Sequence, residues 1–459
     1  MKVAKFGGSS LASGDQIKKV FDIMKSDTDR RILVVSAPGK RNNDDEKVTD
    51  LLIELANSHI EKKDGTVILE KILERYQSIV EELKIKSPVM AQIRQHYQDL
   101  WQRDDLPEAY LLDAYKASGE DNNAKLIAAY FTEQGLESLY VSPSQAKLLV
   151  SDEPGNAQVL PQAYDELVSL LDIPQVVIFP GFFGVSEEGN IVTFSRGGSD
   201  ITGAILAKAL EADLYENFTD VDAIYVAHPG IVKNPLPVDV LSYREMRELS
   251  YAGFSVLHGE ALYPAFSSGI PVHVRNTNNI DTNGTYILRG KGSSLYTISG
   301  IASSSGFISI YIQKFLMNHE VGFLRRVLQI FEDFGISVEH VPTGIDDITV
   351  LMRADQLEES DVDALLNKLK TDLKADQVYV NKYLCLIMLV GEGMINAVGT
   401  TARVTRALAR KQINIEVFNQ GASEVSMMFG IEESLEKAAV KALYEEFFEE
   451  KVDYQLMEK

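Results

Sequence analysis

The sequence contains almost no cysteine and no long apolar run. Cys385 is the single cysteine in 459 residues, so we expect neither a disulfide framework nor a thiolate metal site. The 7 histidines are scattered without a His-x-x-x-His pattern, which argues against a structural zinc site, and we expect no metal held by side chains alone. No apolar run approaches the roughly 20 residues that a membrane span requires, so no membrane partner is expected.

Positive charge is also scarce. The chain carries 45 Lys and Arg against 67 Asp and Glu, a formal net charge of −22. A surface of this sign opposes nucleic-acid binding, so anionic ligands need local pockets of Lys or Arg. The N-terminus, residues 1–6, has neither the long apolar segment nor the cleavage pattern of a signal peptide, which indicates a cytoplasmic protein.

Alternating patterns are what the sequence has in abundance. A length of 459 residues with 45% apolar content suits roughly two to four domains. Residues 1–290 alternate short apolar runs with helical stretches, which predicts a mostly parallel sheet covered by helices. Residues 43–132 read as a helical insertion with mostly solvated charge, in which Trp101 packs against its neighbours. The expected strands are 3–6, 32–35, 139–141, 176–179, 212–215 and 271–274.

An internal repeat follows a Gly- and Ser-rich linker at residues 290–294. Val321-Gly322 recurs as Val398-Gly399, an offset of 77 residues that further pairs share. Each copy predicts a strand, a helix that begins near the glycine, a strand that ends in Glu339 or Glu416, and then another strand and helix. This is the ferredoxin-like plan, and it indicates a catalytic domain followed by a sensing tail. The expected domains are 1–290, 300–378 and 379–459, the last completed by a strand from 300–315.

The segment 195–200 reads Ser-Arg-Gly-Gly-Ser-Asp between an apolar strand and an apolar helical stretch. Backbone N–H groups at such a helix start attract anions. Arg196 adds a planar guanidinium that matches a carboxylate or a phosphate. The alternative is a helix capped by Ser199 or Asp200, with the glycines in a tight turn.

Two further segments suit a nucleotide. Lys5 lies in an apolar strand, where its charge needs a partner, and Gly7–Gly8 can bring backbone N–H groups onto a phosphate. Alternatively, Lys5 reaches solvent at a sheet edge and the glycines form a turn. Thr219–Asp220 ends another expected strand, and with Tyr225 it suits a base and ribose, although a plain loop has the same composition.

Two other segments suit a small substrate. Ser36 ends one strand and Thr49 begins a helix, so both hydroxyls can face one cleft, although caps and turns use the same residues. Glu120 follows a glycine, ahead of a helix expected at 124–131. Its carboxylate can receive a substrate ammonium or cap the start of that helix.

Taken in their order along the chain, these five segments resemble the amino-acid kinase family, and within it the aspartate kinases. Residues 5–10 are similar to the family's Lys-Phe-Gly-Gly-(Thr/Ser)-Ser, 195–200 to its Gly/Ser-Arg-Gly-Gly-Ser-Asp, and 219–221 to its Thr-Asp-Val. Residues 274–277 resemble the strand that closes the kinase domain, and the repeat is similar to paired ACT domains. The resemblance implies an αβα sandwich with a mostly parallel sheet, followed by two ferredoxin-like regulatory domains.

The resemblance also implies the reaction. ATP, with Mg²⁺ brought by its phosphates, would phosphorylate the β-carboxylate of L-aspartate in the first step towards lysine, threonine and methionine. Because that carboxylate is already ionised near neutral pH, no general base is required. The implied catalytic residues are Lys5, on the transferred phosphoryl group, and Asp200, which orients Lys5 or the substrate ammonium. Aspartate would be held by Ser36, Thr49, Glu120 (its ammonium), Arg196 (its α-carboxylate) and Ser199. The nucleotide would be held by Lys5, Gly7, Gly8, Ser9, Thr219, Asp220, Tyr225 and Lys233.

Two family positions are occupied differently in this chain. Gly230 stands where the family commonly has arginine, and Ser255 stands where it often has lysine. Lys233 is the candidate replacement for one of these phosphate contacts. The two losses are the only support for an alternative function, an amino-acid sensor with a weakened kinase head. A kinase of another small substrate, such as glutamate or a carbamate, is a third interpretation.

The tail resembles the regulatory part of lysine-sensitive relatives. The implied effector is lysine, threonine or both, and ACT domains of this kind pair between subunits, so a homodimer or homotetramer is expected. The alternative is a module that only holds subunits together. The matching effector positions are Met317, Glu320, Gly322, Phe323, Leu324, Glu339, Thr343, Asn419 and Gln420.

Overall fold

The computed structural model describes residues 1–195, 197–254, 257, 259–290 and 296–449. The chain divides into two compact units. The first unit contains Met1–Ile224, Pro237–Arg247 and Ser255–Lys291, and the second contains Tyr225–Leu236, Glu248–Phe254 and Gly292–Lys459. Of the linker predicted at residues 290–294, residues 291–294 lie outside the described residues. None of the described helices is long and apolar enough to cross a membrane.

The first unit is built on an eight-stranded sheet with the order β3-β4-β2-β1-β7-β9-β10-β8. Every neighbouring pair is parallel except β9 and β10, which confirms the predicted mixed α/β fold. The sheet strands are β1 (Lys2–Phe6), β2 (Arg30–Val35), β3 (Ser138–Tyr140), β4 (Val176–Pro180), β7 (Leu214–Thr219), β8 (Val240–Ser242), β9 (Val272–Asn276) and β10 (Thr285–Leu288). A separate hairpin joins β5 (Phe183–Val185) to β6 (Ile191–Thr193).

The sequence anticipated six of these strands, with one clear shift. The fifth expected strand, 212–215, is β7, which begins at Leu214 and continues to Thr219. The part of β7 beyond residue 215 contains Glu216 and Asn217, both buried. Polar residues interrupt the apolar run there, so the run alone placed the strand too early.

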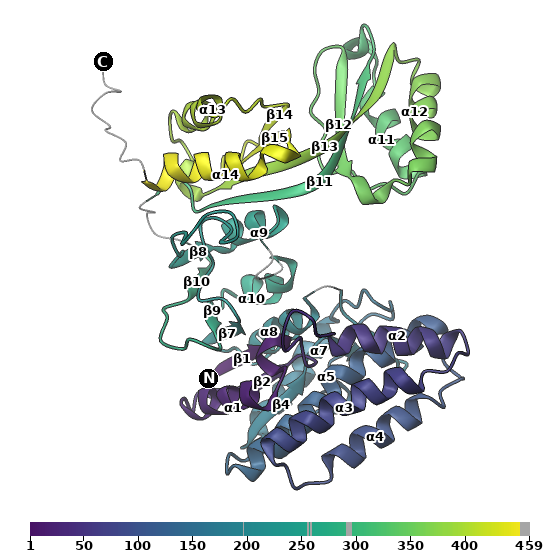
Figure 1. Cartoon of the computed structure of the whole chain (residues 1–459), viewed down its shortest axis with the longest axis vertical. Helices are drawn as coiled ribbons and strands as arrows, with labels where there is room; N and C mark the ends of the chain where they lie inside the picture. Colours follow the sequence, from purple (N-terminus) through teal and green to yellow (C-terminus); the bar gives the residue numbers. More distant parts are fainter. Residues whose placement is uncertain (196, 255–256, 258, 291–295, 450–459) are drawn as a thin grey trace. The chain divides into compact units, whose positions relative to one another are not determined.

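Helices cover the sheet (Figure 1). Figure 1 shows α2, α3 and α4 side by side, and α2 also packs on α5. The expected insertion at 43–132 is therefore helical, and most of its charged side chains are exposed, as predicted. Its inner faces supply much of the core of this unit. The helices are α1 (Gly14–Lys25), α2 (Val48–Ile60), α3 (Thr66–Leu83), α4 (Val89–Leu100), α5 (Glu108–Glu133), α6 (Pro143–Ala146), α7 (Pro161–Leu167), α8 (Gly198–Ala209), α9 (Tyr243–Tyr251) and α10 (Tyr263–Ser268).

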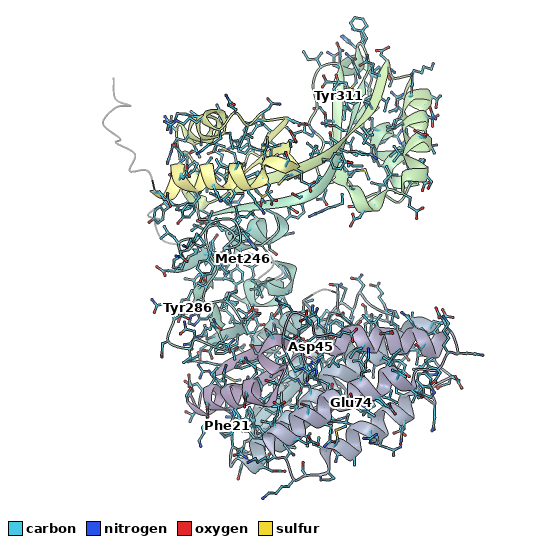
Figure 2. All side chains as sticks on the ribbon, viewed as in Figure 1. Phe21, Asp45, Glu74, Met246, Tyr286 and Tyr311 are labelled. Carbon is cyan, nitrogen blue, oxygen red and sulfur yellow. The ribbon has the colours of Figure 1, made fainter. Side chains whose placement is uncertain are left out.

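Aromatic rings hold the layers of the first unit together. Phe21 of α1, labelled in Figure 2, meets the rings of Tyr130 and Phe131 edge-on at centroid distances of 5.7 and 5.2 Å. Trp101 stacks on His59 at 4.7 Å, a packing role of the kind expected. Such pairs add to the burial of apolar area and fix how helices lie on one another.

The helix expected to begin at residue 124 is wrong. Helix α5 runs unbroken from Glu108 to Glu133, so Glu120 lies within it and caps nothing. Glycine and asparagine at 119–123 signal a break, but packing overrides this local preference. A Cβ on Gly119 would lie 2.9 Å from the Ala37 Cβ and 3.0 Å from Leu52 Cδ1, so only glycine lets the helix approach the end of β2 this closely.

The second unit contains one five-stranded sheet with the order β12-β11-β13-β15-β14. Two long antiparallel strands, β11 and β13, serve both repeats: Gly300–Ser304 of β11 pairs with β13 beside β15, and Phe307–Gln313 also pairs with β12. The strands are β11 (Gly300–Gln313), β12 (Asp347–Arg353), β13 (Gln377–Val390), β14 (Val417–Gln420) and β15 (Ser426–Glu432). The helices are α11 (Phe323–Asp333), α12 (Glu359–Leu373), α13 (Thr400–Arg410) and α14 (Glu436–Tyr444).

The predicted repeat is visible at the helix starts. Gly322 precedes α11 with φ 76° and Gly399 precedes α13 with φ 90°, a backbone region that glycine enters without steric cost. The strands expected to end in Glu339 and Glu416 are wrong. Residues 340–343 form only isolated bridges, and β14 begins after Glu416.

Arg30 and Glu216 form a buried ion pair that joins β2 to β7. Arg30 Nε and Nη2 donate to the two Glu216 oxygens at 2.6 and 3.0 Å, with side-chain exposures of 5% and 1%. Burial opposes the charge of Glu216, but hydrogen bonds from Arg30 and Arg275 hold the pKa of that carboxyl below its usual value. Arg275 Nη1 is the second partner, at 3.2 Å.

We predict that Arg30→Met destabilises the first unit by about 3 kcal/mol, because it leaves Glu216 buried with only Arg275 as partner. Urea unfolding followed by circular dichroism measures the loss. The control is the double variant Arg30→Met/Glu216→Met, which should be more stable than Arg30→Met. Equal stability of the single and double variants would contradict the assignment of the cost to an unpaired charge.

Candidate active site

Lys5 and Asp200 meet at the carboxyl edge of the sheet. Lys5 Nζ lies 2.6 Å from Asp200 Oδ1, and the two side chains are only 10% and 11% exposed. Lys5 comes from β1, and Asp200 from the first turn of α8. The helix is preceded by Gly197 at φ 77°, with no side-chain cap, so the alternative of a cap by Ser199 or Asp200 is wrong. An ammonium and a carboxylate taken this far from water stabilise each other and fix each other's position.

Asn217 and Tyr215 of β7 hold Asp200 in place through hydrogen bonds, and no motif of the sequence indicates either residue. Asn217 Nδ2 donates to Asp200 Oδ1 at 2.8 Å, and the Tyr215 hydroxyl donates to the Asp200 carbonyl at 3.2 Å. Burial raises the pKa of the Tyr215 hydroxyl well above its usual value, so it remains a donor. A polar residue within an apolar strand, as at Asn217, is the same pattern that singles out Lys5 in the sequence.

The ends of three strands are tied together around the Gly7–Gly8 turn. The Gly7 N–H donates to the Phe218 carbonyl at 3.1 Å, and the rings of Phe6 and Phe218 stack at 4.4 Å. The Ser10 and Thr277 hydroxyls lie 2.7 Å apart. The Gly7 amide is therefore used by the sheet, and Gly8 and Ser9 follow it in a short 3₁₀ turn.

A second glycine packs directly on this turn. The Gly39 N–H donates to the Gly8 carbonyl at 2.9 Å, and a Cβ on Gly39 would lie 2.5 Å from the Gly8 carbonyl carbon. Arg75 of α3 fixes Gly39 from the other side, donating to its carbonyl at 2.8 Å and to Asp45 Oδ1 at 2.5 Å. Hydrogen bonds from Arg41 also hold the pKa of Asp45 well below its usual range. The helical insertion thus contacts the turn through one buried arginine, which no motif of the sequence indicates.

Glu120 is a buried acid of α5 within electrostatic range of Lys5. Burial raises its pKa to about 8, against the opposing effects of a hydrogen bond from the Ala37 backbone and of the Lys5 charge. Its Oε2 accepts no hydrogen bond from the described residues. A buried carboxylate with an unused oxygen is suited to a cationic ligand group.

Three hydroxyl residues predicted to hold substrate lie on neighbouring elements. Ser36 follows β2, Thr49 is in the first turn of α2, and Ser199 is in the first turn of α8. A Cβ on Gly181 would lie 2.7 Å from Ser199 Oγ, and the Gly181 N–H donates to the Val35 carbonyl at 2.9 Å. Ser199 therefore lies beside the ends of β2 and β4. Arg196 lies outside the described residues.

The expected nucleotide residues divide between the two units. Thr219 ends β7, and its hydroxyl donates to Asp220 Oδ1 at 3.3 Å. Tyr225 and Lys233 belong to the second unit, where both line a cavity of about 320 Å³ that also includes Gly230. Ser255 lies outside the described residues.

Several predicted effector positions of the first repeat are buried or already paired within the protein. Met317 and Phe323 are buried. Glu320 pairs with Lys314 and Arg326, and its pKa is lowered mainly by the hydrogen bond from Lys314. Glu339 accepts a hydrogen bond from the Tyr251 hydroxyl. The three predicted positions that are exposed are Gly322, Leu324 and Thr343.

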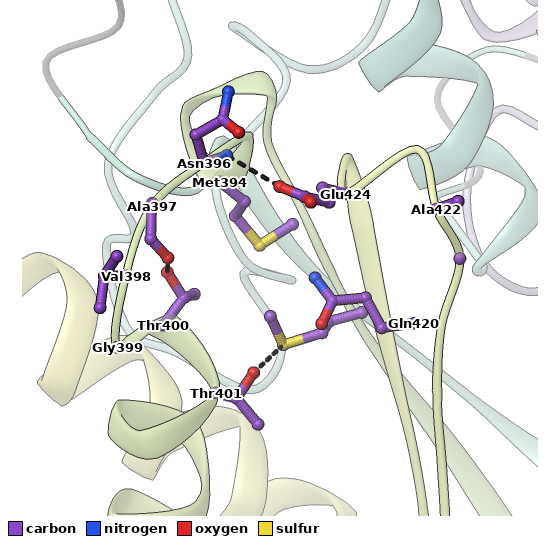
Figure 3. A pocket seen from close by; sticks show the side chains of 12 residues that line it. Met394, Asn396, Ala397, Val398, Gly399, Thr400, Thr401, Gln420, Ala422 and Glu424 are labelled. Carbon is purple, nitrogen blue, oxygen red and sulfur yellow. Dashed lines mark hydrogen bonds between the residues drawn. The ribbon is translucent and has the colours of Figure 1, made fainter.

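Gln420 lines a cavity of about 770 Å³ in the second repeat (Figure 3). In Figure 3 the start of α13 at Gly399–Thr400 faces Gln420 and Glu424, and Glu424 accepts from the Asn396 N–H at 2.8 Å. Asn419 is not part of this cavity; its Nδ2 lies 3.5 Å from His340 Nδ1. Of the nine effector positions, Gln420 is the one that lines this cavity.

Comparison with known proteins identifies the chain. A sequence model of the amino acid kinase family matches residues 1–276. The chain belongs to this family. A model of the ACT domain matches residues 387–447, so both parts of the resemblance are confirmed. Over 449 residues the chain is 54% identical to aspartokinase 3 of Bacillus subtilis (strain 168), covering 98% of this chain and 99% of the relative.

Solved structures of family members have the same architecture. Aspartate kinase from Clostridium acetobutylicum superposes with a TM-score of 0.86 at 35% identity, covering 97% of this chain and all of the other. Aspartokinase III of E. coli, solved in complex with aspartate and ADP, gives a TM-score of 0.78 at 26% identity over 98% of this chain and all of the other. The same enzyme, solved with lysine and aspartate, gives 0.77.

We predict that Gly39→Ala raises the KM for ATP by about 10- to 100-fold, because the added Cβ displaces the Gly8–Ser9 backbone. It should also lower stability by about 1–3 kcal/mol. Nucleotide titration and thermal unfolding measure the two effects. The matched control is Gly290→Ala, where an added Cβ meets no described heavy atom within 4 Å. An unchanged KM for ATP in Gly39→Ala would show that the contact does not position the turn.

Proposed function

We propose that this protein is an aspartate kinase that converts MgATP and L-aspartate to ADP and 4-phospho-L-aspartate. One observation carries the proposal: a buried Lys5–Asp200 ion pair lies close enough to buried Glu120 for the Lys5 charge to act on that carboxyl. A cation for a phosphoryl group and an acid for an ammonium are the two groups that phosphorylation of an amino acid requires. The E. coli relative solved with aspartate and ADP supports this substrate pair.

The roles of the residues follow from their chemistry. Lys5 offsets negative charge that develops on the transferred phosphoryl group, and Asp200, held by Asn217, keeps the ammonium of Lys5 in place. Because the Gly7 amide is used by Phe218, the phosphate donors of the turn are the amides of Gly8 and Ser9, which begin the 3₁₀ turn.

The reaction needs no general base. The β-carboxylate of aspartate is ionised near neutral pH and attacks the γ-phosphorus as the bond to ADP breaks. Glu120 would bind the ammonium of aspartate, and Arg196 would bind its α-carboxylate. The hydroxyls of Ser36, Thr49 and Ser199 would complete the binding of this substrate. Thr219, Asp220, Tyr225 and Lys233 would complete the nucleotide site.

The second unit is proposed to sense lysine, threonine or both, and to join subunits as a homodimer or homotetramer. Support comes from the E. coli relative solved with lysine and aspartate and from the glycine-preceded helix starts in each repeat. The proposed effector contacts are those of the first repeat, with Asn419 and Gln420 in the second.

A coupled assay for ADP release tests the function, with aspartate, glutamate or no acceptor. Aspartate-dependent ADP release is expected, and trapping the acyl phosphate with hydroxylamine identifies the product. Lys5→Met should abolish turnover, and circular dichroism checks the folding of this variant because the change leaves Asp200 without its cationic partner. Lysine and threonine are then added singly and together. Binding of either amino acid without any turnover would instead favour a sensor with an inactive kinase head.

We predict a pH dependence that originates at Glu120. With a pKa of about 8 in the free protein, the carboxyl is mostly neutral at pH 6 and must ionise to receive an ammonium. The kcat/KM for aspartate should therefore rise roughly tenfold per pH unit from pH 6 towards pH 8, then level off. Glu120→Gln should lower kcat/KM and remove this rise. A flat wild-type profile between pH 6 and pH 8 would overturn the assignment.

A further inference from the structure

We propose that Asn123 is a specificity-determining residue, which with Glu120 forms a two-acceptor cradle for the substrate ammonium. This inference rests on the proposed function, and it adds a residue that no motif of the sequence indicates. Glu120 and Asn123 are three positions apart on α5, so their side chains lie on the same face of the helix. Both are buried, with exposures of 5% and 0%.

The loop after β2 fixes the orientation of Asn123. Asn123 Nδ2 donates to the Ser36 carbonyl at 2.7 Å. A carbonyl can only accept, so the amide nitrogen must face Ser36, and the two ends of the amide cannot be exchanged. The Asn123 Oδ1 is thereby placed as an acceptor directed away from the Ser36 carbonyl.

Glu120 and Asn123 each have one acceptor oxygen without a described hydrogen-bond partner. Among the described residues, neither Asn123 Oδ1 nor Glu120 Oε2 has a hydrogen-bond partner, although both atoms are shut off from solvent. Buried polar atoms without partners are uncommon and costly in folded proteins. Two of them on adjacent turns of one helix, each attached to residues 36–37 of the same loop, point to a shared ligand that donates.

The ligand group that fits is an ammonium. It carries three donors and a positive charge, so it can bond to both acceptors and compensate the Glu120 charge. Lys5 does not fill this role, because its Nζ is directed to Asp200 at 2.6 Å and hydrogen-bonds to neither acceptor. A dicarboxylate without an amino group would leave both acceptors unpaired, so the cradle selects aspartate over succinate, a discrimination based on unpaired buried groups.

The adjacent asparagine provides a matched control. Asn122 is also 0% exposed and also has one unpartnered polar atom, Nδ2, but its Oδ1 lies 2.9 Å from His96 Nδ1 of α4. Asn122→Ala therefore removes the same side chain from the same helix at the same depth without touching residues 36–37. A purely structural role for the buried asparagines would give both variants the same kinetic behaviour.

The experiment measures the KM for aspartate, the KM for ATP, and the Ki of succinate as a competitor of aspartate, in the full chain. Asn123→Ala should raise the aspartate KM by about 10- to 100-fold, the loss of a hydrogen bond to a charged group. The ATP KM and the succinate Ki should change by no more than about twofold. Asn122→Ala should leave all three within about twofold of the wild type.

A second variant guards against a folding defect. Asn123→Leu keeps the volume of the side chain without its polar atoms and should show the same loss of selectivity, with folding checked by thermal unfolding. Parallel changes in the aspartate KM and succinate Ki, or equal effects of Asn122→Ala and Asn123→Ala, would overturn the cradle while leaving the proposed function intact. Absence of aspartate-dependent ADP release in the wild type would overturn both.

Discussion

The buried charge of Lys5 is the constraint on which the arrangement of the first unit depends. An ammonium in a central strand of a sheet is unstable without a carboxylate, and Asp200 supplies it at 2.6 Å. That requirement fixes the first turn of α8 over β1, and it explains why β7 carries a buried asparagine that holds the carboxylate. The ion pair between Lys5 and Asp200 thus compensates a buried charge and also takes part in the proposed reaction.

The helical insertion contributes geometry as well as core volume. Through Arg75 it fixes Gly39, and through Gly39 it fixes the backbone of Gly8. Through α5 it brings Glu120 and Asn123 to the loop after β2, a contact that only a glycine at position 119 permits. Helices of the same insertion thus position both the substrate residues and the nucleotide residues, although these residues come from segments far apart in the sequence.

Much of this could be predicted from the sequence, and the failures have identifiable causes. Apolar runs and their spacing located the strand that carries Lys5 and the strand that ends just before Ser36, but the run at 212–215 stopped short of Thr219. The 77-residue offset located Gly322 and Gly399 at helix starts. The helix expected to begin at 124 was wrong because glycine and asparagine normally interrupt helices, whereas here packing on Ala37 maintains α5. Arg75 and Asn123 could not be predicted because nothing local distinguishes a buried polar side chain on a helix from an exposed one, whereas Asn217 interrupts an apolar strand.

By itself the sequence determined the fold class, the family and the residue types of the site, because periodicity and ordered motifs are properties of the chain read in one dimension. Only the tertiary structure decided which of those residues meet, which glycines are forced by close contact, and which buried atoms remain without partners. Hydrogen-bond partners and desolvation depend on three-dimensional neighbours. For that reason the raised pKa of Glu120 and the orientation of the Asn123 amide follow from packing and not from pattern.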